Sequence, residues 1–219
     1  MAAATLAPAA TLPVPGGGAL VLRDDARLSE DRRLEAWSSG FGGSPVDADP
    51  ADPWWKAVAA APLAKAHLTL LDASGATLAD EPLEQPLAKL EVTALPGLPP
   101  TWSVTEDYSA GMGSFNGPIT RFVQVQDGHL VWLQATGDGP PGPVALMRSL
   151  RTEWRLAPPA DLLHVAARPD GPGGDFVVHY SRLYYQDGAL HRRTRTVEGD
   201  QEFESAADFP TESEFPPAF

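Results

Sequence analysis

Residues 176–197 read FVVHYSRLYYQDGALHRRTRTV, and this stretch predicts the main structural feature of the C-terminal half. Valine, tyrosine, threonine and leucine favour strands, and they flank Asp187-Gly188, a dipeptide typical of the two-residue turn in a β-hairpin. Counting outward from that turn gives three cross-strand pairs on one face of the hairpin: Tyr184 with His191, Arg182 with Arg193, and Tyr180 with Arg195. The opposite face is expected to join the core through Val177, His179, Leu183, Tyr185 and Leu190.

The hairpin is basic although the chain is acidic. The whole chain carries a formal net charge of −13, whereas residues 148–195 hold eight arginines against five acidic residues. Like charges directly opposite each other destabilise a strand pair, so Arg182 and Arg193 require a counter-charge. Four sources of compensation are open: the chain's own acidic tail, a protein partner, the tyrosine faces through cation–π contacts, or a small anion such as a carboxylate or phosphate, which matches the guanidinium fork. The tail residues considered for this role are Glu198, Asp200, Glu202 and Glu204.

A second hairpin is predicted over residues 119–135, around Asp127-Gly128. Its expected register places Val125 opposite Leu130 and Val123 opposite Trp132. Both faces carry apolar residues, which is typical of a strand pair that lies between two packed layers.

Other segments are shorter. Helices are predicted over residues 26–37 and 53–64, the second beginning at Pro53, and residues 144–156 fit either a strand or a short helix. The remaining predicted strands are residues 19–22, 67–71, 76–78, 87–94, 101–104 and 162–167.

These elements predict a mainly β fold, an antiparallel barrel or sandwich with one or two short N-terminal helices. The 20 glycines and 23 prolines favour many turns and disfavour long helices. The predicted organisation has four parts: a flexible leader (1–18), a short helical or irregular segment packed on the main domain (19–63), an antiparallel β domain (64–206) and an extended acidic tail (207–219). Four phenylalanines are spaced as anchors for the chain end: Phe203, Phe209, Phe215 and Phe219.

Composition excludes several classes of protein. The chain has no cysteine, which excludes disulfides and thiolate chemistry and fits a cytoplasmic location. No apolar run is long enough for a membrane helix, and the negative charge disfavours binding to nucleic acid or anionic membranes. Gly-x-Ser-x-Gly and phosphate-loop motifs are absent, so no catalytic residue, cofactor or metal site is predicted. The histidines lack metal-ligand spacing, and His164 and His179 are expected in the core.

The hairpin therefore carries the functional hypothesis. We expect a non-catalytic binding or assembly protein that uses Tyr180, Arg182, Tyr184, His191, Arg193 and Arg195 to hold a protein partner or a small anionic ligand. One alternative is a lipocalin-like barrel with an internal ligand. The other is an enzyme without a recognisable motif, which a cleft holding several titratable groups with perturbed pKa values would favour.

Overall fold

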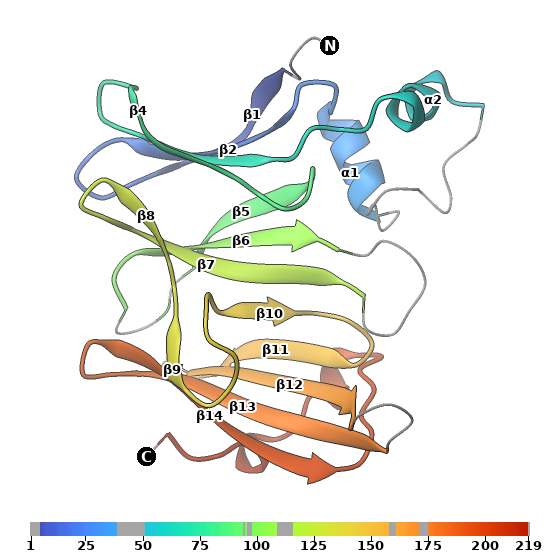
Figure 1. The fold of residues 1–219 in the computed structure, drawn as a ribbon, viewed down its shortest axis with the longest axis vertical. Coiled ribbons are helices and arrows are strands. Elements are labelled where there is room, and N and C mark those ends of the chain that lie inside the picture. Colours follow the sequence, from blue (N-terminus) through green and yellow to red (C-terminus); the bar gives the residue numbers. More distant parts are fainter. Residues whose placement is uncertain are drawn as a thin grey trace.

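The structure is a computed structural model that describes residues 5–38, 51–93, 95, 98–108, 116–157, 161–170 and 175–218. These residues form a mainly β fold with fourteen strands in three sheets and two short helices, α1 (Glu30–Ser38) and α2 (Pro53–Ala60). Figure 1 shows the sheets stacked one above another. The described strands close no barrel, so the sheets pack as open layers instead.

The N-terminal sheet has the order β1-β2-β3-β4. Its strands are β1 (Leu6–Pro13), β2 (Ala19–Asp25), β3 (His67–Leu71) and β4 (Thr77–Pro82). The prediction of a flexible leader is wrong for residues 6–13, because they pair with β2. Gly16, Gly17 and Gly18 form the turn of this hairpin with φ values of 88°, 99° and 96°, which glycine adopts without steric cost. No boundary separates residue 63 from the β domain, since β2 pairs with β3.

The central sheet has the order β10-β7-β6-β5, with β8 paired to β7. Its strands are β5 (Ala88–Thr93), β6 (Thr101–Asp107), β7 (Pro118–Gln126), β8 (His129–Trp132) and β10 (Ala145–Met147). The predicted register of β7 and β8 is confirmed. Asp127 and Gly128 have φ values of 51° and 77°, the left-handed conformation that a type I′ turn requires.

The C-terminal sheet has the order β11-β12-β13-β14-β9, and only the β14–β9 pairing is parallel. Its strands are β9 (Ala135–Gly137), β11 (Thr152–Ala157), β12 (Asp161–Pro169), β13 (Phe176–Gln186) and β14 (Ala189–Glu198). All three predicted pairs of the β13–β14 hairpin are confirmed. Residues 144–156 contain β10 and most of β11, so the strand alternative for this segment is the correct one.

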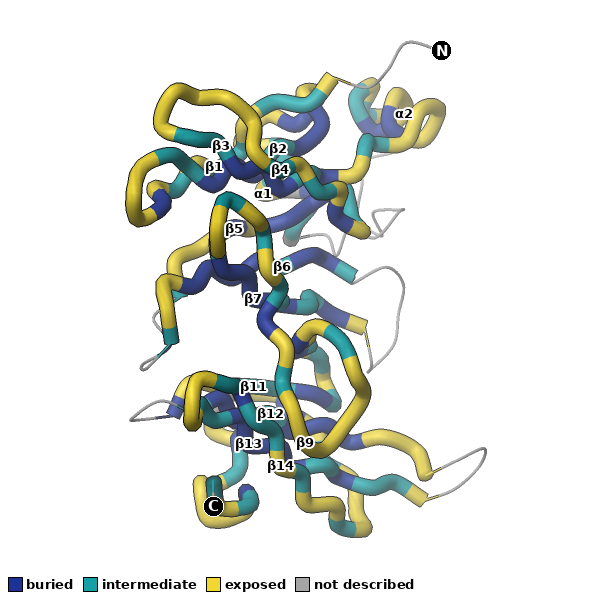
Figure 2. Tube along the Cα trace, turned by 60° about the vertical axis from the view of Figure 1, so that its left-hand side comes forward, coloured by how far each residue is buried: buried dark blue, intermediate teal, exposed yellow. Residues whose placement is uncertain are grey.

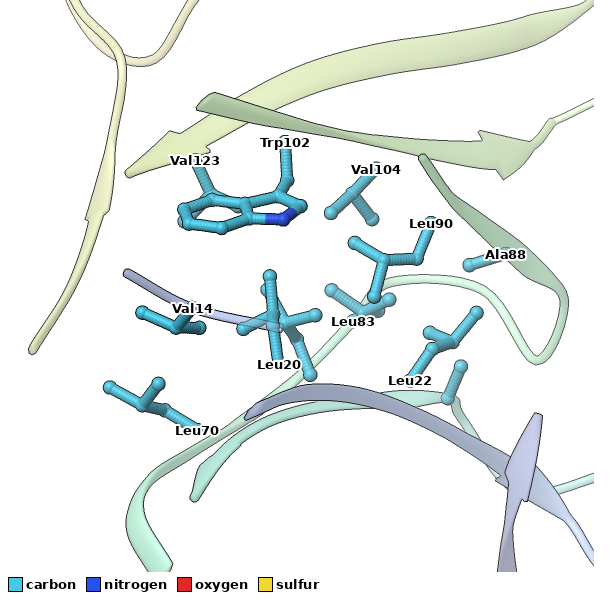
Figure 3. Packing of buried hydrophobic residues seen from close by; sticks show 12 residues of the cluster. Val14, Leu20, Leu22, Leu70, Leu83, Ala88, Leu90, Trp102, Val104 and Val123 are labelled. Carbon is cyan, nitrogen blue, oxygen red and sulfur yellow. The ribbon is translucent and has the colours of Figure 1, made fainter. Parts of the chain in front are cut away.

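Apolar layers lie between the sheets. Figure 3 shows the first layer, in which Leu20 and Leu70 of the N-terminal sheet meet Trp102 and Val123 of the central sheet. Phe122, the neighbour of Val123, belongs to the second layer with Leu183 of the C-terminal sheet. A third layer lies between the C-terminal sheet and the C-terminal tail, residues 199–218, which contains the short helices η1 (Ala206–Asp208) and η2 (Glu212–Glu214). Figure 2 accordingly shows buried segments in each of the three sheets.

The two helices lie beside the N-terminal sheet. An ion pair holds α1 to β2, and Arg27 donates to the carbonyl oxygens of Ala61 and Pro62, just after α2. Asp24 is fully buried and pairs with Arg33 of α1, and Asp25 pairs with Arg27. Trp55 of α2 is buried in a small apolar cluster with Leu87. Neither helix is long and apolar enough to cross a membrane, and the same holds for the short helices elsewhere in the described residues.

Candidate functional site

The β13–β14 hairpin presents two different faces. The outer face is turned toward the C-terminal tail, and the inner face is turned toward the central sheet. The outer face carries the six side chains predicted as a binding surface: Tyr180, Arg182, Tyr184, His191, Arg193 and Arg195. The structure brings all six together on one surface, but their exposure differs. Tyr180 and Arg182 are buried, Tyr184 and His191 are half-buried, and Arg193 and Arg195 are exposed.

Arg182 lies at the centre of the outer face, where the tail covers it. Its guanidinium pairs with Asp161 and Glu212, and its Nε donates to the carbonyl oxygen of Pro216 at 2.7 Å. Burial lowers the pKa of Arg182, but the hydrogen bonds to the two carboxylates outweigh burial and raise this pKa above its usual value. The like-charge contact with Arg193 is therefore compensated inside the chain.

The acids that supply this compensation differ from those considered in the sequence. Among the four considered acids, Asp200 and Glu202 pair with Arg151 instead of the hairpin arginines. The reason lies in the register, because Glu198 is opposite Val177 at the far end of the ladder from Arg182. The tail must fold back along the sheet before Glu212 reaches Arg182.

The tail contacts the outer face through its backbone as well as its side chains. Arg195 donates to the carbonyl oxygen of Glu214 at 3.3 Å, and Arg193 donates to that of Pro217 at 3.3 Å. The Phe215 ring meets the Tyr180 ring edge to face, with centroids 5.5 Å apart. Phe203, Phe209 and Phe215 are buried as predicted, while Phe219 lies outside the described residues.

Tyr184 and His191 lie at the turn end of the outer face. Their rings stack with centroids 5.5 Å apart and an interplanar angle of 26°. The His191 Nδ1 atom lies 3.0 Å from the hydroxyl of Thr136, and its Nε2 atom lies 3.2 Å from the carbonyl oxygen of Gln186. The contact with Thr136 connects the hairpin to β9.

The inner face carries a cavity of about 230 Å³ that the sequence did not predict. It lies between the C-terminal sheet, β10 and the loop that follows β9. Its polar lining consists of His164 and Arg168 from β12, His179 and Ser181 from β13, and Arg192 and Thr194 from β14. Gly139, Pro140, Ala145, Leu146 and Ala166 complete the wall. His164 and His179, expected as core residues, therefore line a polar cavity.

Sheet pairing explains why these residues meet. His164 is opposite Ser181 in the β12–β13 ladder, and Ser181 is opposite Thr194 in the β13–β14 ladder. Arg192 lies two positions before Thr194 and therefore projects from the same face. The sequence signal for this face is that polar residues also occupy the alternate positions of β14, Arg192 and Thr194, between the outer-face residues.

The cavity is electropositive. Burial, reinforced by the positive charges of Arg168 and Arg192 and by His179, lowers the pKa of His164 to about 3. Burial, with a contribution from Arg168, also lowers the pKa of His179, whereas Asp170 acts in the opposite direction. Burial alone lowers the pKa of Arg192. Several groups in one cavity thus have perturbed pKa values, a property common at functional sites.

Other buried acids have structural roles. Glu106 accepts hydrogen bonds from the backbone N–H groups of Glu84 and Gln85 and pairs with Arg121. Within the described part of the chain, no group of three or more histidines and acids is arranged to hold a metal ion.

Comparison with protein-family models, curated proteins and solved structures found no match to this chain. The functional argument therefore rests on the geometry of the two hairpin faces.

Proposed function

We propose that the protein is a non-catalytic binding protein whose outer hairpin face holds an acidic peptide segment from a protein partner, a short helical turn followed by an extended stretch, as in the tail. The observation that carries this proposal is the arrangement of Arg182, Arg193 and Arg195, which donate to backbone carbonyl oxygens within residues 214–217. Contacts to carbonyl oxygens suit an extended segment whose own backbone is unpaired. The tail then acts as an intramolecular copy of the peptide that the partner supplies.

The chemistry of the tail indicates what such a peptide must carry. Residues 212–217 read ESEFPP. Glu212 supplies the carboxylate for Arg182, and Phe215 fills the apolar position beside Tyr180. Pro216 and Pro217 favour an extended backbone and leave their carbonyl oxygens free to accept hydrogen bonds. We therefore expect recognition of an acidic residue followed three positions later by phenylalanine and proline.

The alternatives have less support. A lipocalin-like carrier needs a closed barrel, and the described strands form open sheets. The inner cavity does hold several groups with perturbed pKa values, which an enzyme would show, but an enzyme also needs an activated nucleophile or a matched acid and base. In the inner cavity, the hydroxyl of Ser181 lies 3.0 Å from that of Thr194, and no described carboxylate is within ion-pair distance of His164. A cytoplasmic location belongs to the same proposal and is supported by the absence of cysteine.

The proposal is tested with a labelled peptide of residues 209–218 and a chain that ends at Asp208. We expect the truncated chain to bind the peptide, and the full-length chain to bind it far more weakly because its own tail competes at a high effective concentration. A peptide with Phe215→Ala should bind at least about tenfold more weakly, since it loses a buried aromatic contact. Binding is measured by fluorescence anisotropy.

Arg193→Glu with Arg195→Glu in the truncated chain should abolish peptide binding and keep the fold, because both side chains are exposed. Arg23→Glu on the N-terminal sheet is the control and should bind normally. A folded truncated chain that ignores the peptide would overturn the proposal. If truncation prevents folding, a protease site at Gly199–Asp200 in the full-length chain allows the tail to be cut after folding. Failure of excess peptide to displace the cut tail would then overturn the proposal.

A further inference from the structure

The inner cavity holds positive charge that the described residues do not neutralise. Arg192 is half-buried, and no carboxylate of the described residues forms an ion pair with it. Arg168 lies exposed at the rim of the cavity, and it also forms no ion pair with a carboxylate of the described residues. By contrast, Arg182 on the outer face has two carboxylate partners. A partly buried guanidinium without a counter-charge is costly, so an arrangement of this kind favours an external anion.

Two acids beside the cavity residues, Asp138 and Asp170, do not neutralise its arginines. The carboxylate of Asp138 accepts a hydrogen bond from the backbone N–H of Thr194 at 2.8 Å. Asp170, at the end of β12, is exposed and acts electrostatically on His179. Neither forms an ion pair with Arg168 or Arg192 in the described structure.

We propose that this cavity is a binding site for a small oxyanion, a carboxylate or a phosphate or sulfate group, held by Arg192 with Arg168 at the rim. The guanidinium fork of Arg192 matches two oxygens of such a group. The hydroxyls of Ser181 and Thr194 lie in the same lining and hydrogen-bond to each other at 3.0 Å, so the hydroxyl that accepts this bond keeps its proton to donate to the anion. This site is independent of peptide binding, because it lies on the opposite face of the sheet.

The size and walls of the cavity limit the ligand. Its volume of about 230 Å³ is below the range of roughly 300–1,000 Å³ typical of sites for drug-sized molecules. Pro140, Ala145 and Leu146 form an apolar side opposite the charged side. The cavity thus fits an inorganic oxyanion or a small metabolite with one anionic group and a short apolar body.

The glycine-rich loop 137–142 closes the cavity over Arg192. A Cβ atom at Gly139 would lie 2.6 Å from Nη1 of Arg192, so the loop backbone passes directly over the guanidinium. The backbone N–H of Asp138 donates to the carbonyl oxygen of Arg192 at 3.0 Å, which fixes the loop to β14. The loop backbone at Gly139 therefore limits the position of the Arg192 guanidinium, and the hydrogen bond from Asp138 holds the Arg192 backbone.

The first experiment measures thermal unfolding and calorimetric binding of the full-length protein with inorganic phosphate, sulfate and acetate. Ionic strength is held constant with chloride. We expect saturable stabilisation by at least one oxyanion, and the comparison of acetate with phosphate and sulfate identifies the preferred group. Arg192→Met should weaken binding about tenfold or more, since a charged hydrogen-bonding partner is lost.

Arg193→Met is the matched control, because Arg193 is the next residue on the same strand and projects from the outer face. It should leave oxyanion binding unchanged. Arg168→Met provides a second test at the rim if Arg192→Met fails to fold. The proposal is overturned if no oxyanion gives saturable stabilisation beyond chloride. Equal affinity in the wild-type protein and the cavity variants would also overturn it.

Discussion

Arg192 and Arg193 are consecutive on β14, yet one lines the inner cavity and the other contacts the tail on the outer face. Arg193 lies opposite Arg182 in the ladder, and Arg192 lies opposite Leu183. The alternation of a strand thus places adjacent arginines in two separate environments: Arg193 donates to the carbonyl oxygen of Pro217 in the tail, and Arg192 lines the cavity without a described counter-charge. Variants at these two positions separate the two proposals.

The docking of the tail depends on Phe215. We expect Phe215→Ala to lower the free energy of unfolding by about 3 kcal/mol, because the substitution removes a buried ring packed against Tyr180 and Phe209. Urea unfolding measures the change. Leu156→Ala is the control, since Leu156 is 46% exposed on β11, and it should cost much less. An effect of Phe215→Ala no larger than that of Leu156→Ala would show that the tail is not docked in solution.

Asp25 joins β2 to the helical region. It accepts hydrogen bonds from the Arg27 side chain at 2.7 and 2.9 Å and from the backbone N–H of Ala64 at 2.9 Å. The side-chain bond from Arg27 lowers the pKa of Asp25 from 3.8 to about 2, although burial opposes this. The carboxylate therefore stabilises the fold above pH 3.8, and this contribution disappears as the pH falls from 3.8 to 2.

Asp25→Asn should accordingly lower the free energy of unfolding by about 2 kcal/mol at pH 7, and by less as the pH approaches 2. Glu91→Gln, at an exposed position on β5, is the control and should change little. Denaturant unfolding at several pH values measures both. An Asp25→Asn effect that does not decrease in acid would contradict the assigned ion pair.

The free energy of unfolding has a second pH dependence, from His164. Here burial keeps the group neutral in the folded protein, whereas Asp25 is kept charged. In the folded protein its pKa is about 3, against 6.5 for an ordinary histidine. As the pH falls below 6.5, the unfolded chain binds a proton at this residue and the folded chain does not, so stability decreases. The contribution approaches about 1.4 kcal/mol per pH unit between these values.

His164→Gln should flatten this part of the stability profile, which unfolding measurements between pH 7 and pH 4 reveal. The groups that act on His164 are Arg168 on its own strand, His179 on β13 and Arg192 on β14. His129→Gln is the control, because His129 is exposed at the start of β8. If both variants retain the slope of the wild-type protein, His164 is not the responsible group.

The cavity loop offers a test of backbone geometry. Gly137 has a φ of 101°, and a Cβ atom there would lie 2.3 Å from the carbonyl oxygen of Arg192. Gly142 also has a positive φ, 113°, but open space surrounds its Cβ position. In both alanine variants the left-handed backbone lowers the free energy of unfolding by about 1 kcal/mol. Only Gly137→Ala must also displace β14. Gly137→Ala should therefore be clearly the less stable of the two in thermal unfolding, and equal stability would contradict this close contact.

Local sequence was sufficient for both hairpins. Asp127-Gly128 and Asp187-Gly188 adopt nearly the same left-handed turn, and counting from each turn gave the correct strand pairs. This works because the turn type sets the register over the first few pairs without help from distant residues. The same local rules missed β1, because Gly16–Gly18 and three nearby prolines are typical of a flexible segment. Residues 6–13 form a strand only through their pairing with β2.

The sequence also identified the six outer-face residues as neighbours and the phenylalanines as anchors, because strand alternation and spacing are local properties. What covers the outer face was decided by tertiary structure, since Glu212 reaches Arg182 only after the tail folds back across the sheet. The inner cavity likewise exists only through packing. His164, Ser181 and Arg192 come from three strands and meet a loop near residue 139, and no local pattern encodes contacts across such distances. The pairing of strands and the stacking of sheets, driven by burial of apolar side chains, create that site.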